Sequence, residues 1–407
     1  MLWVAKYGII KQLKEEIVRL KLKNNFMALF GSNERYLGID IANSAIKIVE
    51  LENEKSKPKL ITYGYAEQTN EILTKDTKEV RDKAVFAIKK VLQESRATSR
   101  NVVAALPSYT VFTSIIHLPQ MPKKELVPAV QWEAKKFVPM PLTEMILDWK
   151  ILEDAEDVSQ VPLQAQVSGT ETGQLQNPYA EKQTAKITAK DRQKYFKILL
   201  TAAPKKLVSR YVELFKEAGL NLVSLETESF ALERSLVGRD KSPIMLIDMG
   251  AAATTISIVL DAVPLINRSI DIGGRTITKA IANNLNIDLA RAEQFKRDFG
   301  LTKQQDQLSG QVPKRIQFMV DSVVNEVKYV LNLYQSQGNG NLEKIILAGG
   351  SAWLPNITQY LSMVLGIKVY IGDPWARVMY PVELKSVLQQ IGPRLAVAVG
   401  LAMREIN

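Results

Sequence analysis

Two short segments of this chain combine a carboxylate with a turn of small residues. Residues 244–260 contain an apolar run that ends in Asp248, a turn from Gly250 to Ala253, and a β-rich run that begins at Thr254. This pattern predicts a β-hairpin with a carboxylate at the end of its first strand. Backbone N–H groups at such a turn can approach an oxyanion, and the carboxylate can hold the hydrated cation that accompanies a polyphosphate. In isolation, the aspartate could equally do no more than cap the turn.

The same pattern occurs earlier in the chain. Residues 36–51 contain an apolar run that ends in Asp40, a small polar turn from Ala42 to Ala45, and a second apolar run. Two such hairpins, about two hundred residues apart, predict two related halves that face one ligand. Their aspartates are then expected to converge on the same metal-bearing phosphate group.

A third segment has the residue types of a nucleotide-contacting turn. Residues 344–355 hold an apolar strand, the turn Gly349-Gly350-Ser351, and the start of a helix. Glycines at this turn place bare backbone beside a flat group, and the N-terminus of the helix can meet phosphate. A simple tight turn between strand and helix is the alternative for this element alone. A further glycine pair, Gly273-Gly274, opens another predicted helix.

Composition limits the function classes. The chain has 407 residues, 46% of them hydrophobic, which is enough for two or more domains. It has no cysteine, which excludes disulfides and thiolate chemistry and fits a reducing cytosol. Its one histidine, His117, stands at an alternating position in a predicted strand, so a histidine-based metal site and a Ser–His–Asp triad elsewhere are excluded.

The net charge of +10 allows nucleic acid, an anionic membrane or acidic partners. No compact Lys/Arg block with interleaved aromatics is present, so nucleic-acid binding is not expected. No apolar run reaches the roughly eighteen residues that a transmembrane helix needs, and no segment resembles a cleaved secretion signal.

Hydrophobic periodicity predicts an α/β protein with an inserted unit. Residues 36–107 have the order β-β-β-α-β of a mixed sheet. The next segment predicts strand, helix, strand and strand, at residues 110–118, 122–137, 145–152 and 195–203. Residues 154–190 are poor in aliphatic residues and predict a long mobile loop.

These patterns divide the chain into six parts. Residues 1–34 form an N-terminal extension in which residues 1–26 carry an apolar stripe surrounded by lysines. The extension is interpreted either as a basic amphipathic helix on an anionic membrane or as a start-site overcall, with Met27 as the true start. The other parts are a first lobe at 35–107 and 205–240, the inserted unit at 108–204, a second lobe at 241–385, and a closing helix at 386–407 that returns to the first lobe.

In this order, the two hairpins and the Gly-Gly-Ser turn resemble the first phosphate loop, second phosphate loop and adenosine loop of the actin-like ATPase superfamily. The resemblance implies an actin-like, ribonuclease-H-like two-lobed fold. The insert resembles that of FtsA and, closer still, that of the PilM family of type IV pilus assembly proteins. The likeness covers Met27 to Met403, and the strings that carry it include Gly38-Ile-Asp-Ile41, Pro119-Gln-Met-Pro122, Gln131-Trp-Glu-Ala134, Asp248-Met-Gly-Ala251 and Ala348-Gly-Gly-Ser351.

The resemblance implies ATP and Mg²⁺ as ligands. Asp40 and Asp248 would position the metal ion and its waters. The implied phosphate contacts are Asn43, Ser44 and Lys47 in the first loop and Gly250, Ala251 and Thr254 in the second. The implied adenosine-side contacts are Gly273, Gly274, Glu293, Lys296, Gly349, Gly350 and Ser351. Glu293 and Lys296 could equally form an ordinary solvated helical pair.

The sequence departs from the family pattern at one position. First loops of the PilM family commonly read Asp-Ile-Gly, whereas Ala42 replaces the glycine here. A methyl group at this position limits positive φ and the close approach of phosphate. No residue stands out as a general base, so no catalytic residue is expected. These features predict nucleotide binding with at most slow ATPase activity.

The resemblance also implies partners. In proteins of the PilM family, a groove beside the insert takes the cytoplasmic N-terminal tail of PilN, an ordinary mode of peptide recognition. The helix at 122–137 is a candidate wall through Leu126, Val130, Trp132 and Phe137, unless these residues fill the core of the insert. PilN would link the chain to PilO at the inner face of the cytoplasmic membrane, where positive charge is favourable. The pilus motor ATPases are further candidate partners, and the resemblance implies a role in twitching motility. An oligomer is compatible with this picture.

Three alternatives stay open at this point. An FtsA-like division protein would carry a C-terminal amphipathic anchor after a linker, and the sequence ends directly after the closing helix. A small-molecule kinase of the superfamily would need a base beyond the two loop aspartates. A scaffold that has lost ATP would show no saturable nucleotide binding.

Overall fold

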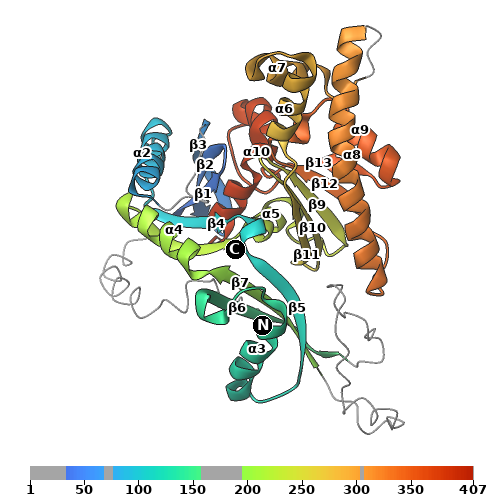
Figure 1. Ribbon diagram of the computed structural model, residues 1–407. Helices are drawn as coiled ribbons and strands as arrows, with labels where there is room; N and C mark the ends of the chain where they lie inside the picture. The colour runs from blue at the N-terminus through green and yellow to red at the C-terminus, as the bar shows by residue number, and fades with distance from the viewer. Residues whose placement is uncertain (1–33, 68–76, 157–194, 303–306, 407) are drawn as a thin grey trace.

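Two five-stranded sheets with the same strand order form the two lobes (Figure 1). The computed structural model describes residues 34–67, 77–156, 195–302 and 307–406. The first sheet has the order β3-β2-β1-β4-β8. Its strands are β1 (Arg35–Ala42), β2 (Ala45–Glu54), β3 (Lys57–Glu67), β4 (Asn101–Leu106) and β8 (Asn221–Thr227). Strands β1, β2 and β3 are antiparallel neighbours, and β4 and β8 continue parallel to β1.

The second sheet repeats this plan with the order β11-β10-β9-β12-β13. Its strands are β9 (Ile244–Met249), β10 (Thr254–Leu260), β11 (Val263–Ile270), β12 (Lys344–Ala348) and β13 (Val369–Ile371). The hairpin of β9 and β10 corresponds to that of β1 and β2, and β12 lies parallel to β9 as β4 lies parallel to β1. The two related halves that the hairpins predicted are therefore present in the fold.

Amphipathic helices cover the outer face of each sheet. In the first lobe, α2 (Lys78–Glu94) and α4 (Lys205–Glu217) bury Ile88, Tyr211 and Phe215 against the apolar side chains of β1 and β4. The hydroxyl of Thr77 begins α2 by accepting a hydrogen bond from the Val80 N–H.

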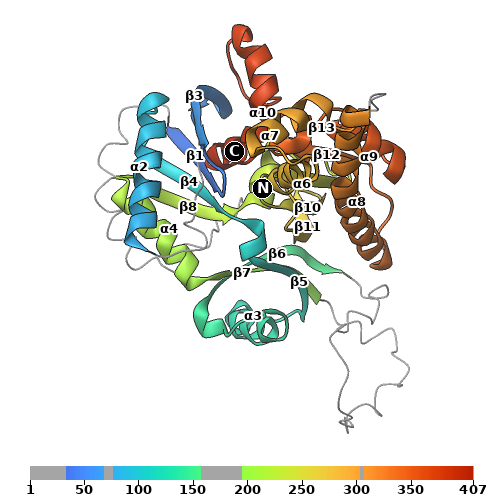
Figure 2. The same cartoon turned by 45° about the horizontal axis from the view of Figure 1, so that its top comes forward.

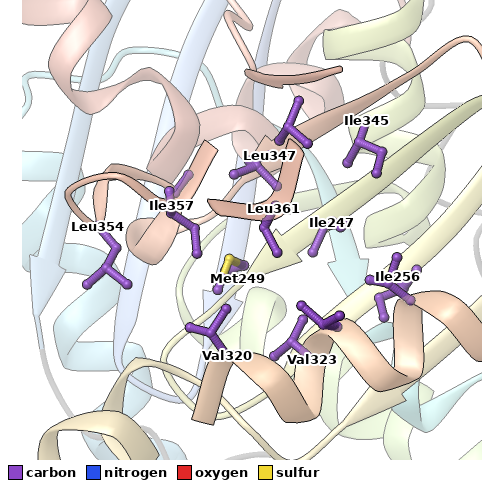
Figure 3. Close-up of a cluster of buried hydrophobic side chains, with 14 of the residues drawn as sticks. Ile247, Met249, Ile256, Val320, Val323, Ile345, Leu347, Leu354, Ile357 and Leu361 are labelled. Atoms are coloured by element: carbon purple, nitrogen blue, oxygen red, sulfur yellow. The ribbon is translucent and has the colours of Figure 1, made fainter. Parts of the chain in front are cut away.

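The second lobe is covered by α6 (Gly274–Leu285), α7 (Leu289–Phe299), α8 (Gln307–Ser336) and α9 (Ile357–Leu365). Figure 3 shows how Val320 and Val323 of α8 and Leu361 of α9 meet Ile247 and Ile256 of the sheet. Helix α8 begins at Gln307 and includes Pro313 in its interior.

Two helices lie between the lobes. One is α5 (Glu228–Leu232), which continues into a π-helical turn, η5 (Glu233–Val237), and leads from the first sheet to the second. The other is α10 (Lys385–Met403), which follows the short turn η7 (Val382–Leu384) and packs on β1, β2 and β4 of the first lobe. Helix α10 therefore takes part in the core of the first lobe.

The inserted segment forms a separate three-stranded antiparallel sheet of order β5-β7-β6. Its elements are a 3₁₀ turn η2 (Ser108–Thr110), β5 (Phe112–Pro119), α3 (Lys123–Phe137), a second 3₁₀ turn η3 (Leu142–Glu144), β6 (Met145–Glu156) and β7 (Tyr195–Pro204). Helix α3 lies on the side of this sheet that is turned away from the lobes (Figures 1 and 2) and buries Leu126, Val130 and Ala134 against it. The strand–helix–strand–strand order matches the prediction.

Several predicted features lie wholly or partly outside the described residues. Strand β6 extends to Glu156, so the first residues of the predicted 154–190 loop are strand, and the remainder of that loop is not described. The N-terminal extension is not described before residue 34. His117 lies in strand β5, as its position in a predicted strand implied, and its side chain is exposed. None of the described helices is both long and apolar enough to cross a membrane.

Candidate functional site

The first predicted loop holds a buried ion pair. Asp40 and Lys47 are cross-strand neighbours in β1 and β2, and the Lys47 Nζ lies 2.7 Å from the Asp40 Oδ2. Asp40 is only 3% exposed. Burial alone would lower the pKa of Lys47, but the Asp40 carboxylate outweighs this effect and the lysine pKa lies above its ordinary value. The lysine is therefore charged and its position is fixed by Asp40.

Asp248, from the other lobe, reaches the same charges. Burial raises the pKa of Asp248 to about 6; Lys47 opposes this shift and Asp40 adds to it. These interactions span the two lobes, because Asp40 and Lys47 belong to the first sheet and Asp248 to β9 of the second. The charges of the two aspartates thus act on a single lysine, and the three side chains carry one net negative charge when both acids are ionised.

A third carboxylate, Glu228, joins this group and was missed in the sequence. Its Oε2 accepts a hydrogen bond of 2.9 Å from the Ser108 backbone N–H. Burial, followed by the charges of Asp40 and Asp248, raises the pKa of Glu228 to about 8. The available signal was its position directly after β8, because ligands of parallel sheets gather at the carboxyl ends of strands. Asp40, Ser108, Asp248 and Gly349 stand at the same ends of β1, β4, β9 and β12.

The elevated pKa of Glu228 predicts a pH-dependent stability. In the unfolded chain the pKa returns to about 4.5, so between pH 4.5 and 8 the folded, ligand-free protein holds a proton that the unfolded chain has lost. Stability therefore falls as pH rises through this window. Glu228→Gln removes this contribution. From pH 5 to pH 9, the free energy of unfolding should therefore fall by on the order of 2 kcal/mol less in the variant than in the wild type. Thermal unfolding of both proteins checks this, and parallel pH curves would contradict it.

The second-lobe loops form a continuous backbone surface beside these charges. The Gly274 N–H donates to the Gly250 carbonyl at 2.9 Å, and the Arg275 N–H donates to the Ala251 carbonyl at 2.9 Å. A Cβ added to Gly273 would lie 2.6 Å from the carbonyl carbon of Ala251. Only glycine allows this approach, which explains why a glycine opens α6 where it meets the Asp248 hairpin.

The predicted adenosine-side residues also meet. Lys296 Nζ donates to the Gly274 carbonyl at 3.1 Å and lies 2.6 Å from Glu293 Oε2, and Thr278 Oγ1 donates to the same glutamate. A Cβ on Gly274 would lie 2.9 Å from the Ser351 hydroxyl, so the Gly-Gly-Ser turn faces the start of α6. Lys296 is only 8% exposed, and thus this pair is a buried structural link, unlike an ordinary solvated helical pair.

Gly349 has a distinct backbone role within its turn. Its φ is +83°, and a Cβ there would collide with the Asp248 carboxylate. Its N–H donates to the Pro393 carbonyl of α10 at 2.9 Å. Gly349 therefore needs to be glycine both for its conformation and for the space beside Asp248. The hydrogen bond to Pro393 attaches the turn to α10. Gly350 follows within the short helical turn η6 (Gly350–Trp353).

The remaining predicted contacts differ in what they offer. The Thr254 hydroxyl is buried and donates to the Ile272 carbonyl at 2.6 Å, so it braces the loop through its side chain. Asn43 and Ser44 are partly exposed at the tip of the first hairpin, after Ala42. From the second lobe, Arg275 Nη2 donates to the Asn43 carbonyl at 3.0 Å. The tip of the first loop is thus held against the start of α6.

The charges of this site fit a divalent cation that is bound together with a polyphosphate. Within the described residues, no group of three or more His, Cys, Asp or Glu side chains is arranged to hold a metal ion by itself. Magnesium commonly takes one or two carboxylates and completes its coordination with phosphate oxygens and water. Asp40 and Asp248 supply such carboxylates, and their combined charge exceeds that of Lys47 when both are ionised.

Comparison with known proteins agrees with the fold and places the chain in a family. Residues 38–190 and 179–406 match the model of a family described as type IV pilus assembly protein PilM. A chain of a PilM–PilN type IV pilus biogenesis complex is 27% identical with a TM-score of 0.72, and the match covers 92% of this chain and 100% of that one.

Two further structures share the fold alone. EutJ, an ethanolamine utilization protein from Carboxydothermus hydrogenoformans, is 14% identical with a TM-score of 0.51 and coverage of 96% and 99%. A MamK double helical filament is 11% identical with a TM-score of 0.51 and coverage of 92% and 98%. The predicted actin-like two-lobed fold is confirmed. The chain belongs to the PilM family of type IV pilus assembly proteins.

Proposed function

We propose that this chain binds Mg·ATP between its lobes and serves as a nucleotide-binding component of the type IV pilus assembly platform. The observation that supports this most strongly is that Asp40 and Asp248, from different lobes, both interact with the charge of Lys47. A buried cation and two carboxylates suit a metal-bearing polyphosphate better than an uncharged ligand.

Each part of the site has a role in this proposal. Asp40 and Asp248 hold the hydrated magnesium ion, and Lys47 neutralises phosphate charge. The loops of Asn43, Ser44, Gly250, Ala251 and Thr254 present backbone groups to the phosphates. Gly273 and Gly274 allow the chain to pass close to the nucleotide, whose adenosine is flanked by Glu293, Lys296, Gly349, Gly350 and Ser351.

Hydrolysis at this site is expected to be slow at most. A bound magnesium ion would supply the positive charge that stabilises the transferred phosphoryl group. No residue of the predicted site is assigned as a general base that activates water. Ala42 also limits how closely the first loop can approach phosphate. The proposed role is therefore nucleotide binding with at most slow ATPase activity.

Isothermal titration of the full chain with ATP tests the nucleotide proposal. Saturable binding that requires magnesium is expected, because both aspartates repel a bare triphosphate. Equal, weak heats with and without magnesium would contradict a Mg·ATP site. Proton release on binding, measured in buffers of different ionisation enthalpy, should accompany it, since a cation lowers the raised pKa of Asp248.

We further propose that the inserted sheet binds the cytoplasmic N-terminal tail of PilN. The neighbouring structure contains a PilM–PilN complex, and its match covers nearly the whole of both chains. Leu126 and Val130 of α3 are buried in the core of the insert and cannot form a wall for a peptide. Trp132 is 66% exposed and Phe137 is 39% exposed, so these two residues offer the apolar surface. Lys135 lies over the Trp132 ring at 5.0 Å and holds it in place.

Trp132→Ala should weaken binding of a PilN-tail peptide at least tenfold, because an exposed tryptophan is a typical interface anchor. Fluorescence anisotropy of a labelled peptide measures this change. Phe86→Ala is a matched control. Phe86 is 70% exposed on α2 of the first lobe, outside the insert, so its substitution should leave the affinity unchanged. Equal affinities for wild type and Trp132→Ala would refute the role of α3.

The two proposed activities are assigned to different parts of the chain. Residues 35–107 and 205–240 form the first lobe, 241–385 the second lobe, 386–407 the closing helix, and 108–204 the PilN-binding insert. Through PilN, the chain would be held at the inner face of the cytoplasmic membrane with PilO, where motor ATPases and the twitching machinery are also expected.

A further inference from the structure

The turn η2 links the candidate nucleotide site directly to the inserted sheet. It follows β4, whose carboxyl end lies beside that of β1, and it leads into β5. The Ser108 backbone N–H donates to Glu228, and the Tyr109 hydroxyl lies 3.5 Å from Asn43 Nδ2. Ser108 and Tyr109, which are adjacent in this turn, therefore contact Glu228 and Asn43 of the candidate site.

The same turn is anchored to the second lobe by buried hydroxyl groups. Ser108 Oγ lies 3.1 Å from Ser229 Oγ, which donates to Asn267 Oδ1 at 2.7 Å. Ser257 Oγ donates to the same amide oxygen at 2.5 Å. Ser229 lies in the first turn of α5, one of the two helices between the lobes, and Ser257 and Asn267 belong to β10 and β11. Ser229 and Ser257 are both buried, with exposed fractions of 0% and 1%.

This junction therefore joins three units at one place: the insert through Ser108, the interlobe helix through Ser229, and the second lobe through Asn267. Strand β5 and η2 also lie against β11 (Figures 1 and 2). Buried polar networks with every member paired favour one arrangement and resist small displacements. A shift of one lobe relative to the other must consequently either break these bonds or move the start of β5.

We propose that η2 couples nucleotide binding to peptide binding on the inserted sheet. The inference rests on the proposed function, because it requires both ligands. A nucleotide that draws the Asp40 and Asp248 loops together changes the positions of Asn43 and Glu228. Tyr109 and Ser108 then carry this displacement to β5 and the sheet behind α3. Coupling of this kind is reciprocal, so the peptide must change nucleotide affinity by the same factor. Ser108 and Tyr109 act as positioning residues.

A thermodynamic cycle on the full chain tests the coupling. The probes are a labelled synthetic peptide of the PilN N-terminal tail and Mg²⁺ with a non-hydrolysable ATP analogue. In the wild type, saturating nucleotide should change the peptide Kd at least fivefold, within the usual range of coupling between sites. In Ser108→Ala/Tyr109→Phe the factor should fall below twofold, while the Kd of each ligand alone stays within threefold of wild type.

Two further variants keep the test specific. Tyr109→Phe alone removes one hydroxyl from a side chain that is 47% exposed, so it retains the fold and should show intermediate coupling. Ser114→Ala is the matched control, because this serine lies on β5 but its hydroxyl contacts the neighbouring Ile115 carbonyl. It should keep full coupling.

Amide hydrogen exchange supplies a second measurement. Nucleotide should slow exchange in residues 108–119 of the wild type and leave it unchanged in the double variant. A wild type that binds both ligands with less than twofold coupling would overturn this inference and leave the proposed function intact. Full coupling in the double variant would overturn the role of η2. Failure of the wild type to bind either ligand would overturn the proposed function and the coupling together.

Discussion

Asp248→Ala should reduce the affinity for Mg·ATP at least a hundredfold, equivalent to about 2.8 kcal/mol of binding free energy. The carboxylate is one of two that can hold the hydrated metal ion, and its partner Asp40 is already engaged by Lys47 at 2.7 Å. The variant should fold at least as stably as the wild type, because burial and Asp40 both disfavour the ionised form of Asp248. Loss of binding would therefore report on the site rather than on unfolding.

Calorimetric titration of Asp248→Ala and of a control variant measures this effect. Asp82→Ala removes an exposed aspartate from α2 and should bind as the wild type does. Thermal unfolding of both variants confirms that each is folded at the temperature of the titration. Unchanged Mg·ATP affinity in Asp248→Ala would remove the central support for a shared metal site between the lobes.

Gly400→Ala should destabilise the protein by about 3 kcal/mol, at the upper end of the usual range for overpacking. Gly400 lies in α10 where this helix crosses α5, and an added Cβ would collide with the Ala231 carbonyl. The added Cβ is fixed by the helix backbone and the atoms that it meets are backbone atoms, so no side chain can move aside. Helix propensity alone predicts the opposite sign, a gain of about 1 kcal/mol for alanine over glycine. The sign of the measured change thus separates the two effects.

Urea unfolding of Gly400→Ala against Gly340→Ala tests this prediction. Gly340 has no atom within 4 Å of its added Cβ and no positive φ, so its substitution should change stability by less than about 0.5 kcal/mol. A Gly400→Ala protein as stable as the wild type would mean that the two interlobe helices are less tightly packed than described.

Much of the fold could be predicted from local pattern. The hairpins of Asp40 and Asp248 alternate regularly between apolar runs and small turns, and both sheets follow from them. Helix α10 continues through Gly392 and Pro393, although an interior proline normally breaks a helix. Its packing on the first sheet stabilises the helix despite this proline.

The candidate site was only partly accessible from sequence. Motifs indicate residues that are close in the chain, such as Asp40 with Lys47, because their spacing reflects one hairpin. Glu228 could not be found in this way, since its importance comes from three elements that meet only in the folded state: β8, the turn at Ser108, and the Asp248 strand. The nucleotide roles of the predicted site residues remain predictions until ligand binding is measured.

The position of α10 in the chain also affects how the protein is made. This helix is the last of the described helices to leave the ribosome, yet it completes the inner layer of the first sheet, which is synthesised near the beginning. One apolar face of β1 and β2 therefore stays uncovered during most of translation. Newly made chains should depend on chaperones that shield exposed strands, and premature termination before residue 385 should yield aggregation rather than a working first lobe.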